Sequence, residues 1–120
     1  KIDTLDQCLE NAKYVITCCP LNKHTFHLLK KDNILLCEKG VKIINVGRGP
    51  IICEKDIIDL LETGFIDSVG FDVFEEEPLS HDNKLRYFKQ NIFGTHNGSN
   101  TLEAVDKVSI KVLEKMEDFL

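Results

Sequence analysis

The sequence predicts an α/β fold in which helices cover a parallel β-sheet. Apolar, β-branched segments typical of strands alternate along the chain with segments of helical periodicity. Two of the expected strands, 14–18 and 41–46, are almost continuously apolar, which is typical of parallel strands buried on both faces. Because crossovers between parallel strands are right-handed, all the expected strands point the same way.

The first half of the chain holds two strands and two short helices. Thr4 can cap the first helix, Pro20 stops the first strand, and we expect Gly40 to end the second helix as a C-cap. The expected elements are, in order, a helix over about 5–11, a strand over 14–18, a loop over 21–30, a helix over about 31–37 and a strand over 41–46.

The second half begins with a Gly47-Arg48-Gly49 turn and ends in a long helix. Gly64 closes the first helix of this half, and Thr101 is placed to cap the last one, which carries a stripe of apolar residues. The expected elements are a helix over 54–62, a strand over 67–72, a loop with one helical turn over 79–90, a strand over 91–95 and a helix from 101 onward.

Charged and polar side chains follow the ends of the expected strands. In parallel sheets of this kind, ligands bind outside the carboxyl ends of the strands. Strand 14–18 ends at Cys19-Pro20, and the other three ends bring an arginine, two acids and a histidine to the same edge: Arg48, Asp72 with Glu77 beyond it, and His96. Each residue alone has a plain structural explanation, but their shared placement favours a catalytic site.

These residue types suit the interconversion of a 2-oxo acid and a 2-hydroxy acid. Arg48 offers a planar fork of donors for a carboxylate. His96 can donate or accept a proton near neutral pH, and a carboxylate beside it, Glu77 or Glu76, favours the protonated imidazolium. The hydride for such a reaction must come from a cofactor.

Composition excludes several other classes of function. The net charge of −5 argues against nucleic acid or an anionic membrane as a partner, and no apolar run approaches a membrane span. The five cysteines form no CxxC pair and mostly sit in apolar runs, which predicts reduced, buried thiols in a cytoplasmic protein. The cysteines lack the close ligand spacing of a zinc site, and His24 and His27, although three apart and able to share one helical turn, have no Cys or acidic residue beside them, so we expect no metal.

Four segments of the chain resemble the D-isomer-specific 2-hydroxyacid dehydrogenases, in the second half of their nicotinamide-binding domain. The order and spacing of the four agree with that family over nearly the whole chain. The segments are Cys18-Cys19-Pro20-Leu21 with Thr25, Gly40 to Ile52 around Asn45-Val46-Gly47-Arg48-Gly49, Phe71-Asp72-Val73-Phe74-Glu75-Glu76-Glu77-Pro78-Leu79, and Thr95-His96-Asn97-Gly98-Ser99-Asn100-Thr101-Leu102-Glu103-Ala104.

The resemblance implies a role for each matching residue. Arg48 would bind the substrate carboxylate and keto oxygen, His96 would be the general acid/base, and Glu77, rather than Glu75 or Glu76, would support the histidine. The cofactor is expected to be NAD, with NADP open because the deciding residue would lie upstream. Its contacts would come from Cys19, Pro20, Val46, Gly47, Arg48, Asp72, His96 and Gly98, with Asp72 on the nicotinamide carboxamide.

The resemblance also implies a fold and a domain organisation. We expect the second half of a Rossmann-type doubly wound sheet over residues 1–100, followed by a long helix over 101–120 that leads toward a substrate domain. The family's G-x-G-x-x-G turn would precede Lys1, so the chain is expected to be a fragment that exposes a sheet edge and apolar surface and, alone, binds the cofactor weakly. The implied partners are a small 2-hydroxy or 2-oxo acid and a second subunit in a homodimer.

Three residues around the histidine depart from the family pattern. Thr95 stands where the family usually has proline, Asn97 where it has an apolar residue, and Ser99 where it has a smaller one. These departures alter the loop that holds His96 and leave room for a changed substrate or weak activity. A separate alternative on the same fold is a non-catalytic, NAD-sensing regulator similar to the corepressors that resemble this family. Turnover of 2-oxo acids would distinguish the enzyme from the regulator.

Overall fold

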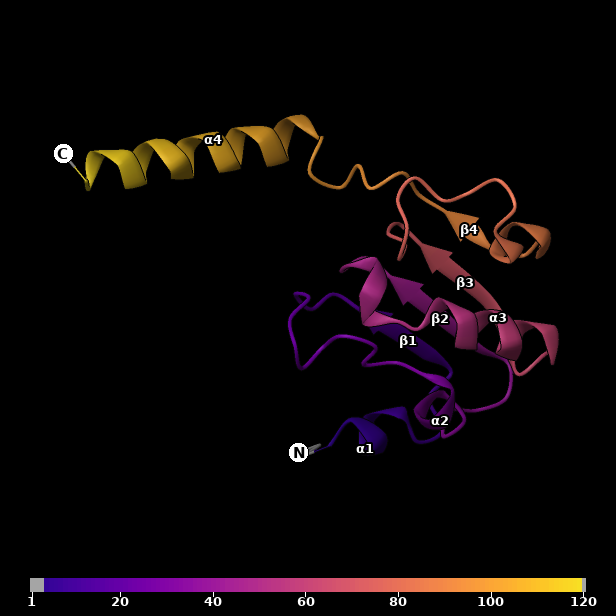
Figure 1. The fold of residues 1–120 in the computed structure, drawn as a ribbon. Coiled ribbons are helices and arrows are strands. Elements are labelled where there is room, and N and C mark those ends of the chain that lie inside the picture. The colour runs from indigo at the N-terminus through magenta and orange to yellow at the C-terminus, as the bar shows by residue number, and fades with distance from the viewer. Residues whose placement is uncertain (1–3, 120) are drawn as a thin grey trace.

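The computed structural model describes residues 4–119 and contains a four-stranded sheet. The strands lie side by side in chain order, and every neighbouring pair is parallel. The expected α/β class is therefore confirmed (Figure 1). The strands are β1 (Tyr14–Thr17), β2 (Val41–Asn45), β3 (Ile66–Phe71) and β4 (Ile92–Phe93).

The helices follow the predicted order, and both predicted threonine caps are confirmed. The Thr4 hydroxyl accepts the Gln7 N–H at 3.3 Å, and the Thr101 hydroxyl accepts the Ala104 N–H at 3.1 Å. The helices are α1 (Leu5–Leu9), α2 (Lys31–Ile34), α3 (Glu54–Glu62) and α4 (Leu102–Glu117), with 3₁₀ turns η1 (Gly49–Ile51) and η2 (Lys84–Tyr87).

Helix α2 is shorter than predicted, and the expected C-cap at Gly40 is wrong. The backbone after Ile34 leaves the helix to bond the segment that follows α1: the Asn11 N–H donates to the Leu36 carbonyl, and the Glu38 N–H donates to the Ala12 carbonyl. Gly40, at a φ of +90°, instead turns the chain into β2. Tertiary hydrogen bonds therefore end this helix before its local sequence would.

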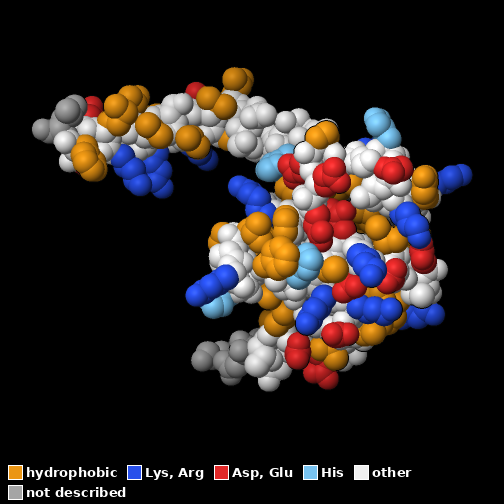
Figure 2. Space-filling view, viewed as in Figure 1, with side chains coloured by type: hydrophobic (Ala, Val, Ile, Leu, Met, Phe, Trp, Pro, Cys, Tyr) orange, Lys and Arg blue, Asp and Glu red, His pale blue; other side chains and the backbone are white. Residues whose placement is uncertain are grey.

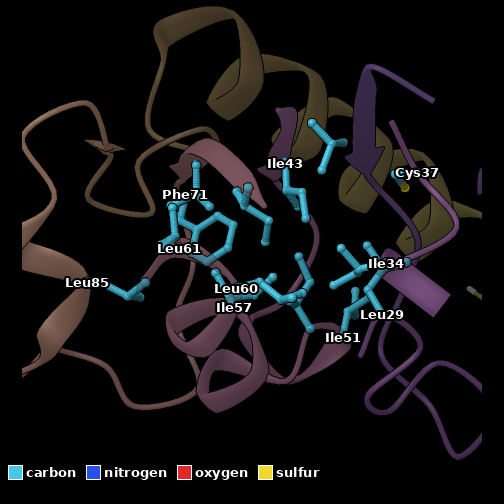
Figure 3. Packing of buried hydrophobic residues seen from close by; sticks show 14 of the residues in the cluster. Leu29, Ile34, Cys37, Ile43, Ile51, Ile57, Leu60, Leu61, Phe71 and Leu85 are labelled. Atoms are coloured by element: carbon cyan, nitrogen blue, oxygen red, sulfur yellow. The ribbon is translucent and has the colours of Figure 1, made fainter. Parts of the chain in front are cut away.

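The core lies on one face of the sheet, where α1, α2 and α3 pack. Along β2 the residues alternate between buried and half-buried, so every second side chain points into this core. Figure 3 shows side chains of the sheet and of α3 meeting between the two layers. Central members of this core are Leu29, Ile34, Ile43, Ile51, Ile57, Leu60 and Phe71.

The other face of the sheet is open within residues 4–119. On this face Tyr14 is 64% exposed and Ile16 is 60% exposed, although both belong to an apolar strand. The prediction that helices cover both faces is therefore wrong for the part of the chain that the structure describes. The exposed apolar surface that the sequence predicts lies here.

The prediction of buried cysteines is wrong for two of the five. Cys37 is buried, whereas Cys8 and Cys18 are exposed; all five thiols are free. Cys18 follows β1, which is an edge strand in this sheet, and Cys8 lines an open hollow between α1 and β1. An apolar run does not bury a side chain that lies on the uncovered side of its element.

Helix α4 projects away from the sheet (Figure 1). None of its described residues is buried, and Figure 2 shows hydrophobic side chains along its length. The division into 1–100 and 101–120 stays a prediction. No helix within residues 4–119 is long and apolar enough to cross a membrane.

Candidate active site

The buried amide of Asn45 holds the turn that follows β2. Its Oδ1 accepts the Gly47 N–H at 3.1 Å and the Thr17 hydroxyl at 2.8 Å, and its Nδ2 donates to the Arg48 carbonyl at 3.0 Å. A buried amide satisfied in this way fixes the backbone around Arg48. No role was predicted for Asn45, although a polar residue at the end of a buried strand is a signal for one.

Gly49 lets this turn lie directly against the segment that follows β3. A Cβ built on Gly49 would lie 1.8 Å from the Phe74 carbonyl oxygen and 2.5 Å from the Glu75 nitrogen. No larger residue fits that separation without moving the backbone. The contact joins the arginine turn to the segment that carries Glu77.

The Arg48 side chain is exposed at this junction. Its Nη1 donates to the Gly47 carbonyl at 2.7 Å. Arg48 also lines a shallow hollow of about 520 Å³ with four of the predicted cofactor contacts: Cys19, Pro20, Val46 and Gly47. This hollow offers apolar side chains and backbone next to one fixed positive charge.

His96 is paired with Glu77. The Nδ1 atom of His96 lies 2.9 Å from Oε2 of Glu77, and the other carboxylate oxygen accepts the Phe74 N–H at 3.0 Å. His96 and the Phe74 N–H together occupy both glutamate oxygens, and the contact uses one ring nitrogen, which leaves Nε2 for a substrate. The hydrogen bond with His96 lowers the pKa of the Glu77 carboxyl most, followed by the Phe74 N–H, and the Arg48 charge adds to the effect.

Asp72 holds the backbone of His96. Its Oδ1 accepts the His96 N–H at 3.0 Å, and His96 adopts a left-handed φ of 57°. Gly94 makes room for this contact, since a Cβ there would lie 2.1 Å from the same oxygen. The predicted contact between Asp72 and the nicotinamide stays a prediction, because here the carboxylate is directed at the histidine segment.

The predicted site residues fall into two hollows. Asp72, Glu77 and His96 line a pocket of about 420 Å³ together with Phe74, Phe93 and Arg86. Arg48 lines the other hollow with the predicted cofactor contacts, and Gly98 is exposed with open space around it. The structure thus assembles the histidine, the glutamate and the aspartate in one pocket and places the arginine beside it, within electrostatic reach of Glu77.

Arg86 has a structural role that the sequence does not predict. Its Nε donates to the Ser80 carbonyl at 2.8 Å, and its Nη2 donates to the Leu79 carbonyl at 2.7 Å. These bonds hold the loop after Pro78 against the pocket. No local motif predicts this, because both acceptors are backbone atoms of an irregular segment.

The sequence is similar to one protein family over most of its length. The family model for the D-isomer specific 2-hydroxyacid dehydrogenase, NAD binding domain, matches residues 1–98. D-3-phosphoglycerate dehydrogenase from Bacillus subtilis (strain 168) is 39% identical over 97% of this chain and 22% of its own length. Glyoxylate/hydroxypyruvate reductase B from Enterobacter sp. (strain 638) is 39% identical over 82% of this chain and 31% of its own length.

The fold is similar to solved structures of the same group. The apo form of Rhodotorula graminis D-mandelate dehydrogenase superposes with a TM-score of 0.92 at 28% identity, over 99% of this chain and 34% of that one. The chain spans about a fifth to a third of the length of the curated relatives described above.

Proposed function

Because the chain belongs to the D-isomer-specific 2-hydroxyacid dehydrogenase family, we propose that it carries the catalytic histidine, glutamate and arginine of a nicotinamide-dependent reductase of 2-oxo acids. The products would be D-2-hydroxy acids. The observation that carries the proposal is the pair of His96 and Glu77, 2.9 Å apart, with the glutamate held from its other side by a backbone N–H. Such a pair positions an imidazole for proton transfer.

Each side chain has a distinct task in the proposed reaction. Arg48 binds the carboxylate of the substrate and orients its keto group. His96 donates a proton from Nε2 to the keto oxygen during reduction and takes it back in the reverse direction. Glu77 keeps the ring in position through its 2.9 Å contact with Nδ1, so that Nε2 faces the substrate.

The residues beside Arg48 fit the nicotinamide end of a dinucleotide. Val46 and Pro20 offer apolar surface, and the backbone of Cys19 and Gly47 lines the same hollow. When bound there, the reduced nicotinamide supplies the hydride. The G-x-G-x-x-G pattern that would hold the pyrophosphate does not occur in the 120 residues, so these contacts cover only one part of the cofactor.

The test is a turnover assay of the intact gene product. NADH oxidation is followed with glyoxylate, hydroxypyruvate, 3-phosphohydroxypyruvate and pyruvate, and then with NADPH. We expect oxidation with at least one acid and its loss in His96→Asn. No oxidation with any acid, by a protein that binds NADH, would favour the NAD-sensing regulator instead.

The structure keeps His96 paired with Glu77 despite the departures from the family pattern, which is compatible with turnover, and the assay is what separates the enzyme from the regulator. The departures at Thr95 and Asn97 make a hydrogen bond with each other, from the Asn97 amide to the Thr95 hydroxyl, and leave the histidine–glutamate contact in place. NAD as cofactor, a cytoplasmic location and a homodimer remain expectations.

A further inference from the structure

Three potential metal ligands from distant parts of the chain meet outside the candidate active site. They are His27 in the loop before α2, Cys53 just before α3, and Glu75 in the segment after β3. Their ligand atoms all lie within 4.8 Å of one another, and Nε2 of His27 is 3.0 Å from Oε1 of Glu75. Because more than 20 residues separate each from the next, no spacing motif reveals them.

Backbone hydrogen bonds position two of the three ligands before any ion is considered. The His27 N–H donates to the Pro50 carbonyl at 2.8 Å, and the Cys53 N–H donates to the Leu29 carbonyl at 2.9 Å. The loop that carries His27 is thus fastened to the turn that leads to Cys53. An isolated β-bridge between Leu29 and Ile52 strengthens the same connection.

The third ligand, Glu75, is fastened by a reciprocal contact with Glu54. The Glu54 N–H donates to Oε1 of Glu75 at 2.9 Å, and the Glu75 N–H donates to a carboxylate oxygen of Glu54 at 2.5 Å. These contacts hold the Glu75 carboxylate beside His27, with one of its oxygens within reach of the other two ligand atoms. Ligands held in this way lose little conformational freedom on binding an ion.

We propose that His27, Cys53 and Glu75 form a binding site for a borderline divalent cation, with Zn²⁺ as the expected ion. Imidazole nitrogen, thiolate sulfur and carboxylate oxygen are the three ligand types that Zn²⁺ takes in proteins. A thiolate and a carboxylate together balance the charge of the ion. The side chains of His27 and Glu75 are each about one-third exposed, so solvent can reach a fourth position.

The alternative is a simple ion pair between His27 and Glu75 with Cys53 as a bystander. That pair explains the 3.0 Å contact but makes no use of the thiol. The two interpretations differ in one observable, a bond from sulfur to the metal. The proposal does not depend on the reductase function, because none of the three residues is assigned a role in that reaction.

The test is a Co²⁺ titration of the 120-residue chain in the presence of a non-thiol reductant. Co²⁺ replaces Zn²⁺ in such sites and gives a thiolate-to-metal charge-transfer absorption. We expect this absorption to saturate at one equivalent, to disappear when Zn²⁺ is added, and to be absent in Cys53→Ser. Loss of a ligand should also weaken Zn²⁺ binding at least about tenfold.

The matched control is the double variant Cys18→Ser with Cys19→Ser, which removes the adjacent thiols at the end of β1. It should keep the absorption, because those thiols lie outside the cluster. If Cys53→Ser fails to fold, as judged by circular dichroism, His27→Gln replaces it and should weaken Zn²⁺ binding to a similar extent. The proposal is overturned if the wild-type chain shows no charge-transfer absorption, if the absorption survives in Cys53→Ser, or if His27→Gln binds Zn²⁺ as tightly as the wild type.

Discussion

Two histidine–glutamate pairs share one short segment of this chain but differ in what surrounds the ring. Glu77 pairs with His96 through Nδ1 at 2.9 Å, and Glu75 pairs with His27 through Nε2 at 3.0 Å. Both histidines have a left-handed backbone, with φ values of 57° and 46°. The pairs are alike in distance and in backbone conformation, so neither property by itself assigns a function.

The two pairs differ in the chemical group that lies beside them. The first pair lines a pocket with Asp72 and lies next to the positive charge of Arg48. The second pair lies beside the Cys53 thiol. A positive charge suits the binding of an anionic substrate, whereas a thiol suits the binding of a soft or borderline metal. The comparison teaches that the chemistry of a histidine–carboxylate pair depends on its neighbour.

Replacing the two histidines separately should have opposite consequences: one variant should lose turnover and the other should lose metal binding. This is the largest expected effect. In the intact gene product, His96→Asn should lower kcat by about 100- to 10,000-fold, because it removes the proton donor, and should leave Co²⁺ binding in place. His27→Asn should abolish the Co²⁺ absorption and lower kcat by much less. His24→Asn, in an exposed loop position, is the control. Similar losses of kcat in His27→Asn and His96→Asn would contradict the division of roles.

Gly49→Ala should disturb both pairs together. The added Cβ would collide with the Phe74 carbonyl and would push away the segment that carries Glu75 and Glu77. We expect the free energy of unfolding to fall by roughly 3 kcal/mol, measured by urea denaturation of the 120-residue chain. Gly70→Ala is the control, since its Cβ would make only an ordinary contact at 3.6 Å. Equal stability of the two variants would show that the two segments can separate freely.

Neutralising each glutamate in turn should distinguish the functions of the two pairs, with smaller effects on kcat and on Zn²⁺ binding than the histidine replacements have. Glu77→Gln keeps the size of the side chain but removes the carboxylate that orients the His96 ring through Nδ1, so kcat near neutral pH should fall at least about tenfold. Glu75→Gln should weaken Zn²⁺ binding and affect kcat less. Steady-state assays of the intact gene product and a Zn²⁺ competition titration measure the two effects. The assignment fails if Glu75→Gln lowers kcat as much as Glu77→Gln.

The smallest expected effect is on the pH dependence of stability. The pKa of Glu77 is lowered in the folded chain, chiefly by the hydrogen bond with His96, so the unfolded chain binds this proton more tightly. The stabilisation is present above the unfolded pKa and is lost as the pH falls through the lowered folded value. Because the side chain is 40% exposed, solvent keeps the effect small.

Urea denaturation of the 120-residue chain at a series of acidic pH values measures this dependence. The wild-type chain should lose more stability on acidification than Glu77→Gln, which has no carboxyl to protonate at this position. Parallel curves for the two proteins would show that Glu77 contributes nothing to the acid dependence.

Local sequence predicts the regular elements well where tertiary contacts agree with it. Helix α3 has the predicted bounds of residues 54–62, and Thr4 and Thr101 make the predicted cap bonds. Helix α2 ends three residues before its predicted end because the backbone at 36–38 pairs with residues 11 and 12. Such bonds depend on a distant segment, so periodicity and cap preferences do not predict them.

The shared edge of the site is predictable for a topological reason. Strands of a parallel sheet place their carboxyl ends together, so the order of elements alone brings Arg48, Asp72 and His96 to one side of the sheet. Arg86 was missed because both of its acceptors are backbone atoms of an irregular segment, and Asn45 because its partners include the Thr17 hydroxyl of a neighbouring strand. A short sequence motif does not indicate side chains whose hydrogen-bond partners lie in distant parts of the chain.

The sequence by itself determined the parallel sheet, its helices and the edge where the reactive residues gather, because hydrophobic periodicity and strand order encode them. From the residues alone, Glu76 and Glu77 were equal candidates to partner His96. The family resemblance singled out Glu77, and only the tertiary structure decided that Glu75 faces His27 and Cys53. The reason is physical: in an irregular segment, the direction of each side chain is set by contacts with distant elements, here Gly49 and Glu54.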